Sequence, residues 1–188
     1  MDKKSIITNK ILIPFVAALV GAIIMLATVF LPYATATEDY AEVLGSYPDE
    51  IVYEELDMTA KDIMNISMVE YAIVYGNLSE QFWGDAAHGI MYVVLVALIG
   101  GFSLLAVLFA VLKKPIAVMI FDILAFGVFS LQNWDYTDRG VIPSSSYDWG
   151  AGYYIFYIAA VIVLVGAVWM LVTKIRTKRQ LKAAENIL

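Results

Sequence analysis

The chain contains no cysteine and only one histidine among its 188 residues. Without thiols it can form no disulfide, and it can supply neither a cysteine ligand for zinc or an iron–sulfur cluster nor a thiol nucleophile. It also lacks the GxSxG, HExxH, P-loop and dinucleotide-binding motifs of common enzyme classes. We therefore expect a protein that is not an enzyme and that has no cofactor, no metal ion and no nucleic-acid partner.

Charge is also scarce, because 16% of the residues are charged and 61% are apolar. A soluble domain of this length cannot keep so much apolar surface away from water, so lipid must surround part of the chain. Four apolar runs are long enough, or nearly long enough, to cross a bilayer as helices. They are residues 11–33, 89–112, 116–131 and 151–172. The sequence therefore predicts an all-α membrane protein with four transmembrane helices in an antiparallel bundle.

The first apolar run has a second interpretation, as a cleaved signal peptide. A basic start, an apolar stretch and the small residues Ala34-Thr35-Ala36 fit such a peptide. The run is longer than a typical signal-peptide core, which favours a helix that stays in the protein.

The few charges are sorted by sign along the chain. Residues 34–88 hold 12 of the 18 acidic residues and one basic residue, Lys61. Ten of the 12 basic residues lie in residues 1–10, the turn 113–115 and the tail 173–188. With four spans these three segments share one side of the membrane, and the positive-inside rule predicts that this side is the cytoplasm. We expect a plasma-membrane protein with both termini inside and, from its composition, a bacterial one.

Residues 34–88 would then lie outside, as would the second polar loop, 132–150. The first polar loop, residues 34–88, is much longer than a segment that only connects two helices. We therefore expect it to form a small, partly helical module. The helix should cover residues 59–75, beginning at the capping pair Thr59 and Asp62 and ending before Gly76-Asn77.

This outer module is rich in aromatic residues of the types that are enriched at protein interfaces, and it is also rich in acidic side chains. An acidic surface would attract a cationic partner. Candidates for binding a protein partner are Tyr40, Tyr47, Tyr53, Glu54, Glu55, Asp57 and Trp83. In the alternative interpretation the rings form the core of the module and its contact with lipid headgroups.

Asp122 is the one acidic residue inside a predicted span. A carboxyl group there costs about 2.5–3.5 kcal/mol to insert and should face the interior of the bundle. Ser103 and Trp169 lie at a similar predicted depth and could donate hydrogen bonds to it. Asp122 could serve as a proton or cation site, or it could only fix the packing of the helices.

The tail after the fourth span is strongly basic. Its candidates for binding anionic lipid are Lys174, Arg176, Lys178, Arg179 and Lys182. The same residues would also fix the orientation of the chain in the membrane.

The order of segments resembles the layout of claudin-like four-span proteins, with a long first outer loop, a tight inner turn, a shorter second loop and an inner tail. That family carries a Gly-Leu-Trp element and a cysteine pair in its first loop. Here Gly76-Asn77-Leu78 precedes a separate Trp83, and there is no cysteine. The resemblance covers topology only, and we do not assign the chain to that family.

Two functions follow from these features. The first is a non-enzymatic interaction or accessory protein that presents residues 34–88 to a protein partner. The second is a small transporter or channel subunit that uses Asp122. Four helices leave little room for a pathway, so this subunit would be a homo-oligomer, which the small residues at Gly100-Gly101 would allow. A membrane enzyme whose chemistry comes from a partner is the remaining alternative.

Overall fold

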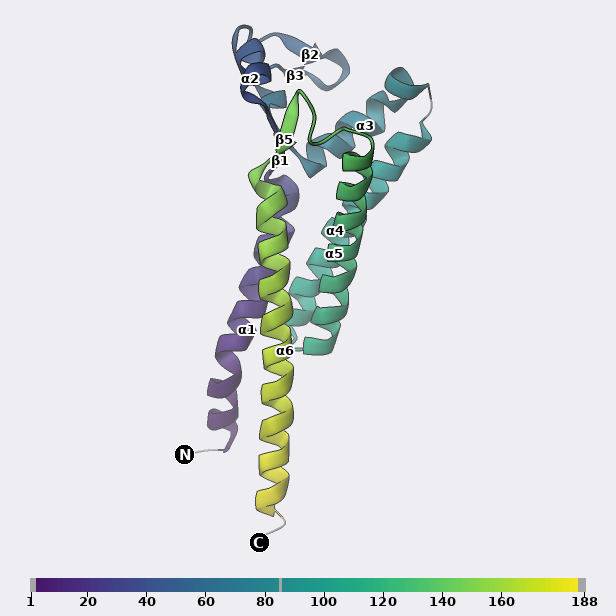
Figure 1. Cartoon of the computed structure of the whole chain (residues 1–188). Coiled ribbons are helices and arrows are strands. Elements are labelled where there is room, and N and C mark those ends of the chain that lie inside the picture. The colour runs from purple at the N-terminus through teal and green to yellow at the C-terminus, as the bar shows by residue number, and fades with distance from the viewer. Residues whose placement is uncertain (1–2, 85, 186–188) are drawn as a thin grey trace.

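The computed structural model describes residues 3–84 and 86–185. Most of the chain is helical, and four helices are long and apolar enough to cross a membrane, which confirms the four predicted segments (Figure 1). These helices are α1 (Lys3–Ala27), α4 (Ala87–Val111), α5 (Pro115–Asp138) and α6 (Ala151–Glu185). The turn at residues 113–115 is as short as predicted, because Lys113 adopts a positive φ of 53° and Pro115 begins α5 at once.

The long helices associate mainly as two pairs, α1 with α6 and α4 with α5, and α5 also packs against α6 (Figure 1). Small residues permit the close approach of α1 and α6. A Cβ atom added to Gly166 would lie 2.6 Å from the backbone nitrogen of Ala18. Since lipid tails are as apolar as leucine, such close backbone packing is a main source of association between helices in a bilayer.

The remaining elements form a compact head at the end of the molecule opposite both termini (Figure 1). We use "head" for residues 32–83 and 141–150. Its elements are β1 (Pro32–Ala36), α2 (Glu38–Gly45), β2 (Ile51–Tyr53), β3 (Met58–Thr59), β4 (Asn65–Ser67), α3 (Met68–Trp83) and β5 (Tyr147–Trp149). The described residues also contain three short 3-10 turns, at Thr28–Phe30, Glu54–Leu56 and Asp62–Met64.

A small β-sheet corrects the expectation of an all-α protein. Strand β1 lies between β4 and β5 and is antiparallel to both, with Ala34 opposite Ile66 on one side and Trp149 on the other. Strands β2 and β3 form a separate two-stranded ribbon. Because β1 and β4 come from the first loop and β5 from the second, the sheet joins the two loops into one unit.

The long helix of the head differs from its prediction at both ends. Thr59 and Asp62 do bond reciprocally, but they precede only the turn at Asp62–Met64. Helix α3 begins later, at a capping box in which the Ser67 hydroxyl accepts from the Glu70 amide and the Glu70 carboxylate accepts from the Ser67 amide. It then continues through Gly76-Asn77 to Trp83 and ends at Gly84, whose φ is 70°.

Replacing Ser67 by alanine should therefore destabilise the head by about 1 kcal/mol, because the Glu70 amide loses its acceptor. Thr59→Ala should cost less, since Thr59 caps only one turn of 3-10 helix. Thermal unfolding of both variants in detergent would compare them. Equal effects would contradict the assignment of the start of α3.

Helix α5 also extends beyond residue 131, where its apolar segment was expected to end. It continues to Asp138, and its last two turns bury one face against the rest of the protein. Gln132, Asn133 and Tyr136 are buried on the same face as Phe129. Much of the expected loop 132–150 is therefore helix, and only the part after Asp138 contributes to the head.

Candidate functional site

The end of the head furthest from both termini exposes apolar side chains among acidic ones (Figure 1). Val43 is 49% exposed, Tyr47 37%, Ile51 49% and Val52 38%. They follow one another along α2, the next turn and β2, and we call these four residues the tip patch. The exposed acidic residues around them in sequence are Glu42, Asp49, Glu50, Glu54, Glu55 and Asp57.

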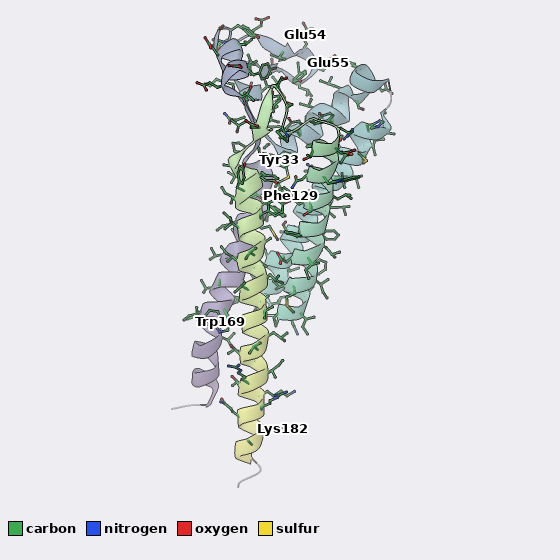
Figure 2. All side chains as sticks on the ribbon, viewed as in Figure 1. Tyr33, Glu54, Glu55, Phe129, Trp169 and Lys182 are labelled. Atoms are coloured by element: carbon green, nitrogen blue, oxygen red, sulfur yellow. The ribbon has the colours of Figure 1, made fainter. Side chains whose placement is uncertain are left out.

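The structure separates the predicted partner-binding residues into two groups. Tyr47, Glu54, Glu55 and Asp57 are exposed at the tip, where Figure 2 shows Glu54 and Glu55. The Glu55 carboxylate accepts a hydrogen bond from Gln81 of α3 at 2.8 Å, and this bond lowers the pKa of Glu55.

The other candidates are less available to a partner. Tyr40 and Tyr53 are half-buried, and the Tyr40 ring packs edge-on against Tyr147 with 5.5 Å between ring centroids. Trp83 ends α3, but its side chain lies outside the described part of the structure. The tyrosines of the head therefore serve mainly as its core, which is the alternative interpretation of the sequence.

A cluster of tyrosines, four buried and one half-buried, connects the head to the long helices. Its members, here called the tyrosine core, are Tyr33, Tyr71, Tyr75, Tyr92 and Tyr136. Successive centroids are 6.2 Å apart from Tyr33 to Tyr71, 5.6 Å from Tyr71 to Tyr75, 4.8 Å from Tyr75 to Tyr92 and 5.0 Å from Tyr92 to Tyr136. Because the five rings come from β1, α3, α4 and α5, they pack the head against two of the long helices.

Hydrogen bonds reinforce this junction. The Tyr33 hydroxyl donates to Oδ1 of Asn133 at 2.5 Å, and Nδ2 of Asn133 donates to the Tyr157 hydroxyl at 2.9 Å. The Tyr92 hydroxyl donates to Asp135 at 2.8 Å, and Asp135 also pairs with Arg139 one turn later. These bonds form two separate sets, one that joins β1, α5 and α6 through Asn133 and one that joins α4 to α5 through Asp135.

Burial raises the pKa of Tyr33 and of Tyr71 far above the usual value, and it raises that of Tyr75 to about 12. In the unfolded chain a tyrosine ionises at about pH 10. The folded state therefore holds its phenolic protons more tightly. The stability that this contributes is fully present below about pH 10 and is lost as the pH rises through the folded-state pKa values.

We accordingly expect alkaline unfolding to begin at about pH 10, with the buried tyrosines ionising during unfolding. Circular dichroism and tyrosinate absorbance, followed together in a pH titration, would check this. Ionisation of all the tyrosines while the circular dichroism stays native would contradict it.

Asp122 lies deep in the helical part and is only 2% exposed. Its Oδ1 is buried and has no hydrogen-bond partner among the described residues. The two donors expected for it are engaged or turned elsewhere. The Ser103 hydroxyl donates to the Ile99 carbonyl at 2.7 Å, and the Trp169 side chain on α6 is 49% exposed (Figure 2).

A cavity of about 370 Å³ adjoins this carboxyl group. Its lining residues come from α5 and α6, and besides Asp122 they are Ile123, Phe126, Ala160, Val161 and Leu164. Ile123 and Val161 are each 58% exposed, so the cavity opens toward the surface that lipid would cover. An unpaired carboxyl group at such an opening could exchange a proton or accept a hydrogen bond from a ligand.

The predicted lipid-binding residues lie at the opposite end of the molecule from the tip. Arg176, Lys178, Arg179 and Lys182 are exposed along the last turns of α6, where Figure 2 shows Lys182. Lys174 differs from them because it is half-buried and its ammonium group donates to the backbone carbonyl of Lys113.

No metal site emerges from the part of the chain that the structure describes, since no three His, Asp or Glu side chains there are grouped to hold an ion. Comparisons of the chain with protein families, with curated proteins and with solved structures found no match.

Proposed function

We propose that the chain is an integral plasma-membrane protein whose four long helices form an antiparallel bundle, with the head outside and both termini in the cytoplasm. The sorting of charge supports this orientation. The head is acidic, whereas the opposite end carries the turn lysines and the basic stretch of α6. Placing the basic end outside would violate the positive-inside rule.

We further propose that the protein is a non-enzymatic interaction protein whose tip binds a partner with a basic surface. The tip patch is the observation that carries this proposal. Four apolar side chains are exposed at the point furthest from the membrane, where neither the head's own core nor lipid can cover them. Acidic residues around an apolar centre match the polar rim and apolar core of protein interfaces, and they select a cationic partner.

The proposal is tested by partner capture from native membranes in mild detergent, with reversed charges at the tip. Glu50→Lys/Glu54→Lys should lose the captured partner. The matched control is Asp138→Lys/Asp148→Lys, which changes the net charge equally at exposed acids away from the tip. A partner that both variants retain, or that both variants lose, would show that the tip is not the binding surface.

A transporter or channel subunit is the second candidate, and the unpaired Oδ1 of Asp122 beside an open cavity is the observation that favours it. Purified protein in liposomes should then conduct protons or a cation, and Asp122→Asn should abolish the flux while the protein stays folded. Absence of flux in the wild-type protein at every pH and potential tried would eliminate this candidate.

A further inference from the structure

Three lysines meet where the α4–α5 turn lies beside α6. The Lys174 ammonium group donates to the backbone carbonyl of Lys113, which holds α6 against the turn. The Lys113 ammonium lies over the Phe15 ring of α1, 5.0 Å from its centroid. Lys113 and Lys114 both repel the charge on Lys174. No described carboxylate pairs with any of the three, so their combined field favours an anion.

An apolar cavity of about 480 Å³ begins at the same place, between α4, α5 and α6. Its apolar lining residues are Phe109, Pro115, Ile116, Ala117, Ile120 and Leu171, and Lys114 and Lys174 complete the wall. The volume lies within the range of about 300–1,000 Å³ that is typical of ligand sites. The cavity beside Asp122 lies along the same interface of α5 and α6. It begins about one turn of α5 further from the α4–α5 turn.

The lysines and the cavity together specify the chemistry of the occupant. A small inorganic anion would use the lysines and leave the apolar wall unused. A neutral lipid would cover the wall and leave the lysines without a counter-charge. Anionic phospholipids carry both parts, and basic pockets between helices on the cytoplasmic side are known to bind such headgroups.

We propose that one anionic phospholipid of the cytoplasmic leaflet binds here, with its phosphate at Lys114 and Lys174 and one acyl chain along α5 and α6. This site goes beyond the proposed function. It depends on the membrane orientation described above but not on a protein partner at the tip. It also differs from general attraction to the basic tail, because Arg176, Lys178, Arg179 and Lys182 do not line the cavity.

Native mass spectrometry of the full chain in detergent, titrated with phosphatidylglycerol and with phosphatidylcholine, tests the site. We expect one phosphatidylglycerol to bind in preference to phosphatidylcholine. Lys114→Gln/Lys174→Gln should weaken that binding about 30-fold, because the loss of each lysine near an anionic headgroup lowers the affinity about fivefold. The comparison variant Lys178→Gln/Lys182→Gln removes the same charge from exposed positions of the tail and should weaken binding much less, because neither residue lines the cavity.

A second variant covers the case in which the lysine variant does not fold. Ala117→Trp should fill the cavity without changing any charge, and it should abolish retention of the lipid. Equal losses in the cavity and tail lysine variants would overturn the proposal, as would equal binding of the two lipids. Displacement of phosphatidylglycerol by inorganic phosphate would show an anion site that does not use the apolar wall, and this would also overturn it.

Discussion

Replacing Tyr33 by alanine is expected to lower the free energy of unfolding by about 3–5 kcal/mol, the usual cost of removing a buried aromatic ring. The Tyr33 side chain is fully buried, and its ring is 5.4 Å from that of Trp149 and 6.0 Å from those of Phe129 and Tyr136, measured between centroids. Figure 2 shows Tyr33 and Phe129 together where the head meets the helices. Truncation would therefore open a cavity where β1, β5 and α5 meet.

Two further variants separate the ring from its hydroxyl. Tyr33→Phe keeps the ring and leaves Oδ1 of Asn133 without its donor, which should cost about 1–3 kcal/mol. Tyr154→Ala is the matched control, because this tyrosine is 56% exposed on α6. Chemical or thermal unfolding in detergent provides the comparison. If Tyr33→Ala were no more destabilising than Tyr154→Ala, the head would not be fixed on the helices by the tyrosine core.

Replacing Gly166 by leucine should separate α1 from α6. The first carbon of any side chain at this position would lie 2.6 Å from the backbone nitrogen and 3.0 Å from the Cα of Ala18, so the two helix backbones would have to move apart. Gly166→Ala should destabilise by about 1–3 kcal/mol, as overpacking usually does, and leucine by more. The lost contact is a backbone contact between helices, which hydrophobic side chains in lipid cannot replace.

Gly127→Leu is the control for this variant. It makes the same change in the middle of α5, where an added Cβ would meet no atom within 4 Å. The midpoint of thermal unfolding should fall for Gly166→Leu and stay close to that of the wild type for Gly127→Leu. A similar midpoint for both variants would mean that α1 and α6 do not need close backbone contact.

The four apolar helices could be predicted from the sequence because their signal is local and long. A bilayer requires about 20 successive apolar residues per helix, and each of the four runs comes near that length within itself. The tight turn at residues 113–115 was equally local. In both cases the sequence of the segment itself determines its structure, without contacts to distant residues.

The sheet could not be predicted in this way. Each strand has five residues or fewer, and β1 finds its partners at Asn65–Ser67 and Tyr147–Trp149, far along the chain. The start of α3 was a different case, since Ser67 and Glu70 already show the spacing of a capping box. The pair Thr59 and Asp62 has the same spacing and precedes an apolar stripe, which predicts an earlier start, whereas in the structure residues 65–67 form β4 through pairing with β1.

Some of the candidate sites could also be predicted from the sequence, and others could not. The acidic tip and the basic end follow from charge sorting, which is visible in the sequence. The tyrosine core and the polar network at Asn133 depend on rings from four elements, and no spacing along one element reveals them. The cavity between Lys114 and Lys174 joins a turn to a helix about 60 residues later, so only the packing of α5 against α6 brings its parts together.

The orientation of the chain is the claim on which the proposed tip and lipid sites both depend, and the lack of cysteine makes it directly measurable. Val52→Cys at the tip and Lys182→Cys at the basic end would each introduce a single thiol at an exposed position. A membrane-impermeant maleimide applied to intact cells should label Val52→Cys at once and Lys182→Cys only after the membrane is permeabilised. Labelling of Lys182→Cys in intact cells, with Val52→Cys protected, would contradict the account.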